Sequence, residues 1–150
     1  MARQAELRVF SIQEANRSIA ELRKTLPALR RILGDIEKME DRLEILHLIC
    51  NRSVASDNPD LQEYLNHKVK YHRKISEFEG LLLHLEAEGY LLRDLEKGVV
   101  HFLGRKGGKN VLLCWKEGEK SISHWHSLQD GSTDEDGRRP IRNYDDFARH

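Results

Sequence analysis

Apolar residues recur at steps of three and four positions through the first third of the chain, the spacing that places side chains on one face of an α-helix. Ser11 and Glu14 precede this stripe with the spacing of a capping box, in which each side chain accepts a hydrogen bond from the other residue's backbone. The pattern predicts a long amphipathic helix from Ser11 to about Cys50, with the heptad seam of a coiled coil. The apolar positions of the seam are Ala15, Ile19, Leu22, Leu26, Leu29, Leu33, Ile36 and Leu43.

Pro27 lies inside this predicted helix. Proline offers no backbone N–H, and its ring clashes with the preceding turn of a helix. The chain therefore either kinks at this point or divides into a short first helix and a longer one that begins near Pro27. Of the two, we expect the kink.

A second helix is predicted to begin at Pro59 and end before Gly89. Asp57 and Asn58 supply capping side chains, and proline is well tolerated at the first helical position. Residues 51–57 are polar and are expected to form a short loop, so the two helices should form an antiparallel hairpin over residues 11–88. The expected inward stripe of the second helix comprises Leu61, Leu65, Lys68, His72, Ile75, Phe78, Leu82 and Leu85.

After Gly89 the hydrophobic period changes from 3.6 to 2, and β-branched and aromatic residues become frequent. Glycine-containing turns separate the apolar segments, which favours an antiparallel β-meander over residues 90–126. We therefore predict a single α+β domain over residues 1–150, with a mobile polar tail at 129–150. The four expected strands are 90–93, 99–103, 110–115 and 121–125.

Composition restricts the partners. The 25 basic residues balance the 25 acidic ones, so the chain has no net field that would attract nucleic acid or an anionic membrane. No apolar run reaches the roughly 20 residues of a membrane span, and the first ten residues lack the apolar core of a signal peptide. The two cysteines, Cys50 and Cys114, form no disulfide framework, which favours a cytoplasmic location.

A Leu-Cys-Trp, Gly-Glu, Trp-His succession lies near the end of the predicted sheet, at residues 113–115, 118–119 and 125–126. With this motif as the most specific one, several stretches of the chain resemble a family of uncharacterised bacterial proteins, domain of unknown function 2203 (DUF2203). The resemblance spans most of the chain and implies a shared fold, but the family carries no established activity. The similar stretches are Ala15-Asn16, Leu26-Pro27, 92–102, 111–119 and Trp125-His126.

The chain departs from the family pattern at two places. His101 stands where the family pattern has an aspartate, and the C-terminal tail is more acidic than the usual ending, which contains glycine and arginine. The resemblance implies that Arg138 or Arg139 is the counterpart of that arginine.

The sharpest chemical pattern lies in the last predicted strand, where His124 and His126 are two residues apart. Alternate residues of a strand project from the same face, so two imidazoles could bind zinc or iron if a third ligand approaches. The candidates for that third position are Asp94, His101, Cys114 and Glu119. The structural alternative is that this Trp-His segment provides packing and one hydrogen bond.

The turn at Glu117-Gly118 decides whether Cys114 can take part. A two-residue turn would place Cys114 opposite Ser121, on the face away from His124 and His126. A three-residue turn would place it opposite Ile122, on the histidine face. The sequence leaves both registers open.

The same residues allow a pocket or a catalytic cysteine. Cys114 could be a nucleophile activated by His126 or His101, although a cysteine in a central strand is more often a buried thiol. We therefore assign no catalytic residue. The residues that could line a pocket are Asp94, Cys114, Trp115, Glu119, Trp125 and His126.

Taken together, the patterns favour a protein-binding or assembly module without catalytic activity, with a zinc- or iron-binding protein as the alternative. The seam of the first helix is longer than the second helix can cover. We therefore expect a partner, either a second copy in a symmetric dimer or another protein.

Overall fold

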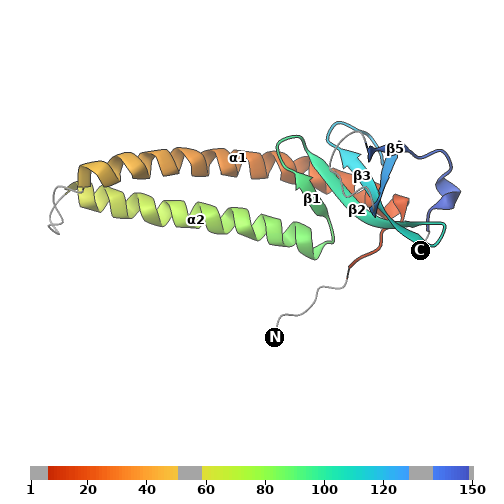
Figure 1. Ribbon diagram of the computed structural model, residues 1–150. Coiled ribbons are helices and arrows are strands. Elements are labelled where there is room, and N and C mark those ends of the chain that lie inside the picture. The colour runs from red at the N-terminus through yellow and green to blue at the C-terminus, as the bar shows by residue number, and fades with distance from the viewer. Residues whose placement is uncertain (1–6, 51–58, 129–136, 149–150) are drawn as a thin grey trace. The chain divides into compact units, whose positions relative to one another are not determined.

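The computed structural model describes residues 7–50, 59–128 and 137–148, and the Cys50 side chain lies outside this description. Two helices, α1 (Ile12–Cys50) and α2 (Pro59–Ala87), precede a five-stranded antiparallel sheet (Figure 1). This confirms the α+β class, the helical hairpin and the meander. The chain divides into two compact units. One contains the residues up to Pro27 together with those from Leu83 onward, and the other contains 28–82.

The sheet has the strand order β1-β2-β3-β4-β5, and every neighbouring pair is antiparallel. The strands are β1 (Leu91–Asp94), β2 (Val99–Lys106), β3 (Lys109–Lys116), β4 (His124–Ser127) and β5 (Arg139–Pro140). The hairpin between β2 and β3 turns on Gly107 and Gly108, whose φ angles of 56° and 79° suit a type I′ turn. The strands therefore extend to Lys106 and from Lys109, further than predicted.

The first turns of α1 pack on one face of the sheet. The capping box is confirmed, because the Glu14 N–H donates to Ser11 Oγ at 3.1 Å and the Ser11 N–H donates to Glu14 Oε1 at 3.1 Å. Phe10 stacks edge-on against Phe102 of β2, with ring centroids 5.1 Å apart. The apolar core of this unit consists mainly of Ala15, Ile19, Leu22, Leu26, Val100, Phe102, Leu113 and Trp115.

The last predicted strand is displaced. Ser121, Ile122 and Ser123 lie outside any strand, and β4 begins at His124. The reason is a tertiary contact: Ile122 is fully buried and its N–H donates to Asn16 Oδ1 of α1 at 2.7 Å. The local apolar alternation therefore records burial against α1 and not strand pairing.

Part of the expected polar tail has regular structure. β5 pairs with β4, and a 3-10 helix, η3, covers Tyr144–Asp146. Phe147 after it is buried and bridges to Lys106. The two-residue strand and single turn are too short to give a periodic signal. Residues 129–136 and 149–150 lie outside the described residues, so the mobility of the tail stays a prediction.

In the other unit, α1 and α2 run antiparallel with many polar contacts between them. Arg42 pairs with Glu63 at 2.5 Å, and the Tyr71 hydroxyl donates to Glu40 at 3.0 Å. The predicted inward stripe of α2 is wrong over part of its length, because three of its members are exposed: Leu65, Lys68 and His72. Half-buried positions of α2 are occupied by Glu63, Tyr71 and Lys74, whose long side chains make polar contacts with α1.

The helix ends and Pro27 follow local rules. Pro59 begins α2, and after α2 the Tyr90 N–H donates back to the Leu85 carbonyl at 3.0 Å across Gly89.

α1 is continuous through Pro27, so a division into two helices is wrong, while the kink stays a prediction. The Asp57-Asn58 cap and the 51–57 loop lie outside the described residues. No helix in the described parts of the chain has the length and apolar run needed to cross a bilayer.

Gly98, between β1 and β2, provides a test of the fold. Its φ is +72°, and an added Cβ would lie 2.5 Å from the Glu117 Cβ. We expect Gly98→Ala to lower the free energy of unfolding by more than about 1 kcal/mol, from backbone strain and the clash together.

Gly34 in α1 is the matched control, because nothing lies within 4 Å of its added Cβ. Gly34→Ala should stabilise the protein by about 0.5–1 kcal/mol. Urea denaturation checks both signs, and equal effects would contradict the assigned turn.

Candidate metal centre

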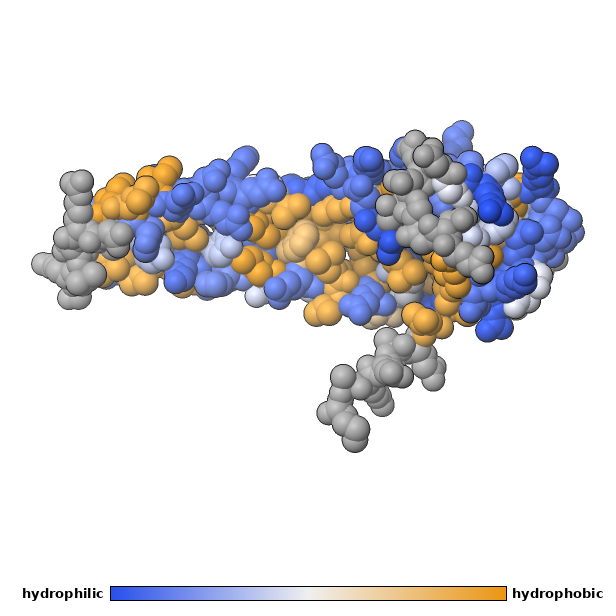
Figure 2. Space-filling model, in the orientation of Figure 1, coloured by the Kyte–Doolittle hydropathy of each residue, from blue (hydrophilic) through white to orange (hydrophobic). Residues whose placement is uncertain are grey.

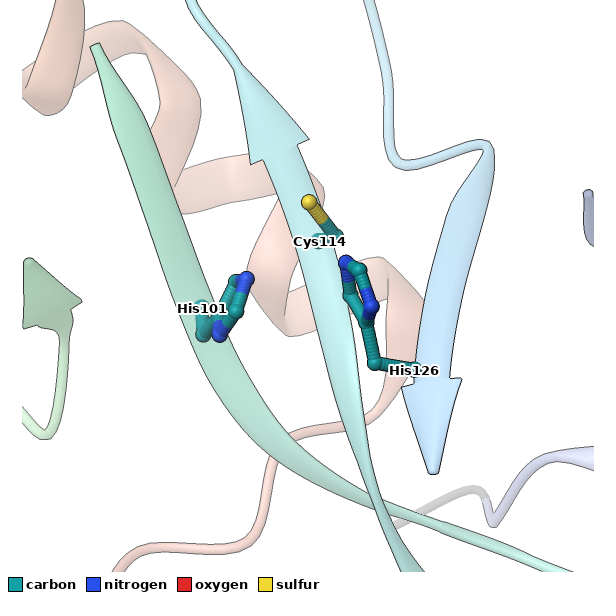
Figure 3. Close-up of side chains that lie close together, drawn as sticks. All are labelled: His101, Cys114 and His126. Carbon is teal, nitrogen blue, oxygen red and sulfur yellow. The ribbon is translucent and has the colours of Figure 1, made fainter. Parts of the chain in front are cut away.

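Three side chains from three neighbouring strands meet on the face of the sheet opposite α1. They are His101 of β2, Cys114 of β3 and His126 of β4, and Figure 3 shows them in front of the sheet with α1 behind it. One potential ligand atom from each residue lies within 4.8 Å of the other two. The imidazole ring centroids are 5.0 Å apart, with an interplanar angle of 42°.

Strand register brings these residues together. His101 is directly opposite Cys114 in the β2–β3 pair, as the two-residue Gly107-Gly108 turn requires. On the other side of β3, Cys114 is opposite His124, and His126 is opposite Leu112. Residues directly opposite each other, or two apart on one strand, share a face, so all three ligating side chains project from one face.

The turn between β3 and β4 has neither of the two lengths considered from the sequence. Residues 117–123 separate these strands. Cys114 is therefore opposite neither Ser121 nor Ile122 but opposite His124. It shares the face of His124 and His126, as the three-residue alternative also implied.

The three side chains are buried, each with a residue exposure of 1%. Burial, together with the smaller effects of the nearby His126, Arg93 and Arg138, lowers the pKa of His101 to about 4. His101 is therefore neutral at neutral pH. Neither of its ring nitrogens has a hydrogen-bond partner among the described residues. A neutral imidazole with a free nitrogen is the form that binds a metal ion.

Burial also raises the pKa of the Cys114 thiol, and the positive charge of Arg138 only partly opposes this effect. The thiol is thus protonated in the metal-free protein, which does not favour a nucleophilic cysteine. Glu119, which could have oriented an activating imidazole, instead accepts from Arg138 at 2.7 Å and from the Lys116 N–H at 2.7 Å. Glu119 is therefore engaged by Arg138 and by the Lys116 backbone.

Two imidazoles and a thiolate are suitable ligands for zinc, which binds nitrogen at about 2.0–2.1 Å and sulfur at about 2.3 Å. Ligands on such a tetrahedral ion lie roughly 3.3–3.8 Å apart by that geometry. The three potential ligand atoms lie within 4.8 Å of one another, so their separations exceed these values by at most about 1.5 Å. The arrangement is therefore compatible with a three-ligand metal centre.

The other metal candidates lie outside the cluster. His124 shares the face but is half-buried, with its Nδ1 at 2.8 Å from Ser123 Oγ and 3.5 Å from Glu119 Oε2. Asp94 accepts from the Lys97 N–H at 2.9 Å and serves the turn after β1. Among the described residues, His126 groups with His101 and Cys114, and His124 is not part of this group.

The two tryptophans do not form a wall for these ligands. Trp115 is fully buried, faces the α1 side of the sheet and donates its Nε1–H to the Glu119 carbonyl at 2.9 Å. Trp125 is opposite Leu113 and so shares that side. The charged groups of Lys106 and Arg139 lie 5.0 Å and 5.2 Å from the centroid of its ring. Strand alternation places both rings on the face away from the cluster.

Arg138 is the neighbour that the sequence did not single out as a site residue. It pairs with Glu119 and interacts electrostatically with Cys114 and His101. Its position became apparent only from the pairing of β5 with β4. By contrast, the Gly107-Gly108 dipeptide is a hairpin signal that could have aligned His101 with Cys114 from the sequence alone.

The buried His101 predicts acid sensitivity. An unfolded chain takes up a proton on this residue below about pH 6.5, whereas the folded chain resists until about pH 4. His101 should therefore contribute stability that is present above pH 6.5 and is lost as the pH falls towards 4. This lost stability should reach roughly 3 kcal/mol.

Urea denaturation of metal-free protein, repeated from about pH 7.5 to about pH 4, measures this loss. His101→Gln should flatten the pH dependence, whereas His72→Gln, at an exposed position of α2, should leave it unchanged. Identical pH profiles for His101→Gln and the unaltered protein would contradict the assigned burial.

Comparisons with known proteins agree with the resemblance seen in the sequence. No curated protein and no solved structure matches the chain. A family model described as "Uncharacterized conserved protein (DUF2203)" matches residues 8–141, which include α1, α2, the sheet and the three clustered side chains. The chain therefore belongs to the DUF2203 family.

Proposed function

We propose that the protein binds one transition-metal ion, with zinc as the best fit, through His101, Cys114 and His126. The observation that carries the proposal is His101, a residue that is 1% exposed and whose two ring nitrogens have no hydrogen-bond partner among the described residues. Buried polar groups are nearly always hydrogen-bonded, and leaving one without a partner costs about 1–3 kcal/mol. A metal ion would engage one ring nitrogen.

The composition of the cluster gives further support. An imidazole that served only packing could be replaced by an apolar ring without loss, yet here two imidazoles and a thiol lie together in a position closed to water. Apparent binding free energies of structural zinc sites reach about 10–16 kcal/mol, more than the cost of about 1–3 kcal/mol for an unpartnered buried group such as the His101 ring. Metal binding would thus offset the penalty of this arrangement.

The ligands favour zinc over iron. Soft thiolate ligands suit Zn²⁺, and a given site with nitrogen and sulfur ligands generally binds Zn²⁺ more tightly than Fe²⁺. Iron sites of the non-haem type use two histidines with a carboxylate, but neither Asp94 nor Glu119 belongs to the cluster. Zinc is therefore the metal to test first, with iron as its competitor.

The test is metal analysis and zinc titration of protein purified without an affinity tag. We expect one zinc ion per chain, and removal of a ligand in His101→Ala, Cys114→Ser or His126→Ala should weaken binding by more than about 100-fold, since even residues outside the ligand set commonly account for 10–100-fold. Affinity should also fall in acid, because protonated ligands do not bind metal.

His124→Ala separates the proposed ligands from the alternative pair on β4. His124 shares a strand with His126, but its side chain is half-buried and bonded to Ser123. Zinc affinity should stay within a few-fold of the unaltered value in this variant. Absence of stoichiometric zinc, or equal losses in His124→Ala and His101→Ala, would sink the proposal.

A second candidate function is assembly through self-association. Large apolar side chains are exposed towards the end of α1 and the start of α2, and Figure 2 shows hydrophobic surface over these ends. Contiguous exposed apolar surface commonly marks a protein interface. The residues that support this proposal are 45–66% exposed, and they are Ile45, Leu48, Ile49, Leu65 and Val69.

If this surface mediates a dimer, Leu48→Lys should dissociate it, because a desolvated ammonium would lie in an apolar interface. Leu48 is 66% exposed, so the substitution should leave the monomer fold intact. Leu83→Lys is the matched control, since Leu83 is 63% exposed but lies near the other end of α2. Sedimentation or light scattering distinguishes the variants. A monomer at all micromolar concentrations of the unaltered protein removes the assembly proposal.

A further inference from the structure

The charges around the candidate metal centre are mostly positive. The positive charges of Arg93 and Arg138 both interact electrostatically with His101. Among the described contacts, Glu119 is the only carboxylate that interacts with the cluster, and it is paired with Arg138. A divalent ion bound by two neutral imidazoles and one thiolate carries a net charge of about +1 from these ligand charges. Isolated net charge in a buried position is strongly unfavourable. The centre therefore needs a further negative charge.

The number of protein ligands leaves room for such a charge. Within the described residues, the cluster offers three ligands, from His101, Cys114 and His126. Zinc sites with three protein ligands keep a fourth position for water or another small molecule, whereas closed structural sites have four protein ligands. An ion at this centre would therefore bind one further ligand.

Arg138 is placed to bind that ligand. It directly precedes β5, in which Arg139 is opposite Trp125. Alternation along the strand thus places Arg138 on the opposite face from Arg139, the face that carries His126. This placement agrees with the electrostatic interactions of Arg138 with both Cys114 and His101.

The hydrogen bonds of Arg138 leave one donor unused. One terminal nitrogen donates to Glu119 Oε1 at 2.7 Å, which fixes the guanidinium. The Nε–H is buried and has no hydrogen-bond partner among the described residues, while the side chain as a whole is 16% exposed. A fixed guanidinium with a free, buried N–H is a strong donor for an anion.

We propose that the metal ion of this centre takes a small exogenous anion as its fourth ligand and that Arg138 hydrogen-bonds this anion. The inference rests on the proposed metal function and adds to it a ligand class, small monovalent anions, and a residue that selects them. Glu119 acts through Arg138 as a positioning residue, because it holds the guanidinium in place.

The test uses protein loaded with Co²⁺ in place of zinc and titrated with azide. Cobalt absorbs visible light in a way that depends on its ligands, so azide should change the spectrum with saturation at one equivalent per metal. Arg138→Met should bind Co²⁺ but weaken azide binding roughly 10- to 100-fold, the loss of one hydrogen bond to a charged group. Arg138→Lys, which retains the charge without the planar fork, should give an intermediate loss.

Arg139→Met is the matched control, because the neighbouring arginine lies over Trp125 on the other face. It should bind azide as the unaltered protein does. Failure to bind Co²⁺ would refute the metal function itself. Binding of Co²⁺ with a spectrum that azide does not change, or equal azide affinity in Arg138→Met and Arg139→Met, would overturn the anion site while leaving the metal function intact.

Discussion

The backbone pairing of β2 with β3 is the constraint on which the sheet and its candidate site both depend. A strand alternates its side chains between two faces, so a shift of one residue would move every side chain of β3 to the other face. The Gly107-Gly108 turn prevents this shift, because it fixes Lys106 opposite Lys109 and consequently His101 opposite Cys114. The same register directs Phe102 and Leu113 towards α1. One turn thus determines both the apolar core and the polar cluster behind it.

The two faces of β3 explain why this unit can hold an unusual polar group. On one face, burial of Trp115 and Leu113 against the start of α1 supplies hydrophobic stabilisation of about 1.5–3 kcal/mol per large side chain. On the other face, His101, Cys114 and His126 are equally buried but contribute little of this kind. The first face stabilises the strand strongly enough for the second to carry groups that are costly to bury. This division of roles is common where a functional site is built on a rigid sheet.

Glu119 links the loop between β3 and β4 to its surroundings. Its carbonyl accepts from Trp115 Nε1 and Arg23, and its carboxylate accepts from Arg138 and the Lys116 N–H. The loop therefore connects α1, the core tryptophan and the segment before β5. A charge-assisted network of this kind rigidifies the site more effectively than a single surface ion pair, because the partly buried carboxylate has several donors. The helical hairpin is held differently, through exposed and half-exposed polar contacts such as that between Arg42 and Glu63.

The sequence by itself determined the elements that depend on neighbouring residues. The capping box at Ser11, the start of α2 at Pro59 and the change to a β-meander after Gly89 are local signals, and the structure confirms each. The sequence also included His101, Cys114 and His126 among the candidate site residues, because histidine and cysteine are few in the sheet region. Tertiary structure alone decided which of them meet. The length of the 117–123 loop, the burial of Ile122 against Asn16 and the pairing of β5 with β4 all depend on contacts between distant segments. Hydrophobic periodicity reports only on residues that are close in the sequence. It therefore paired His124 with His126 and gave no indication that Arg138 lies near them.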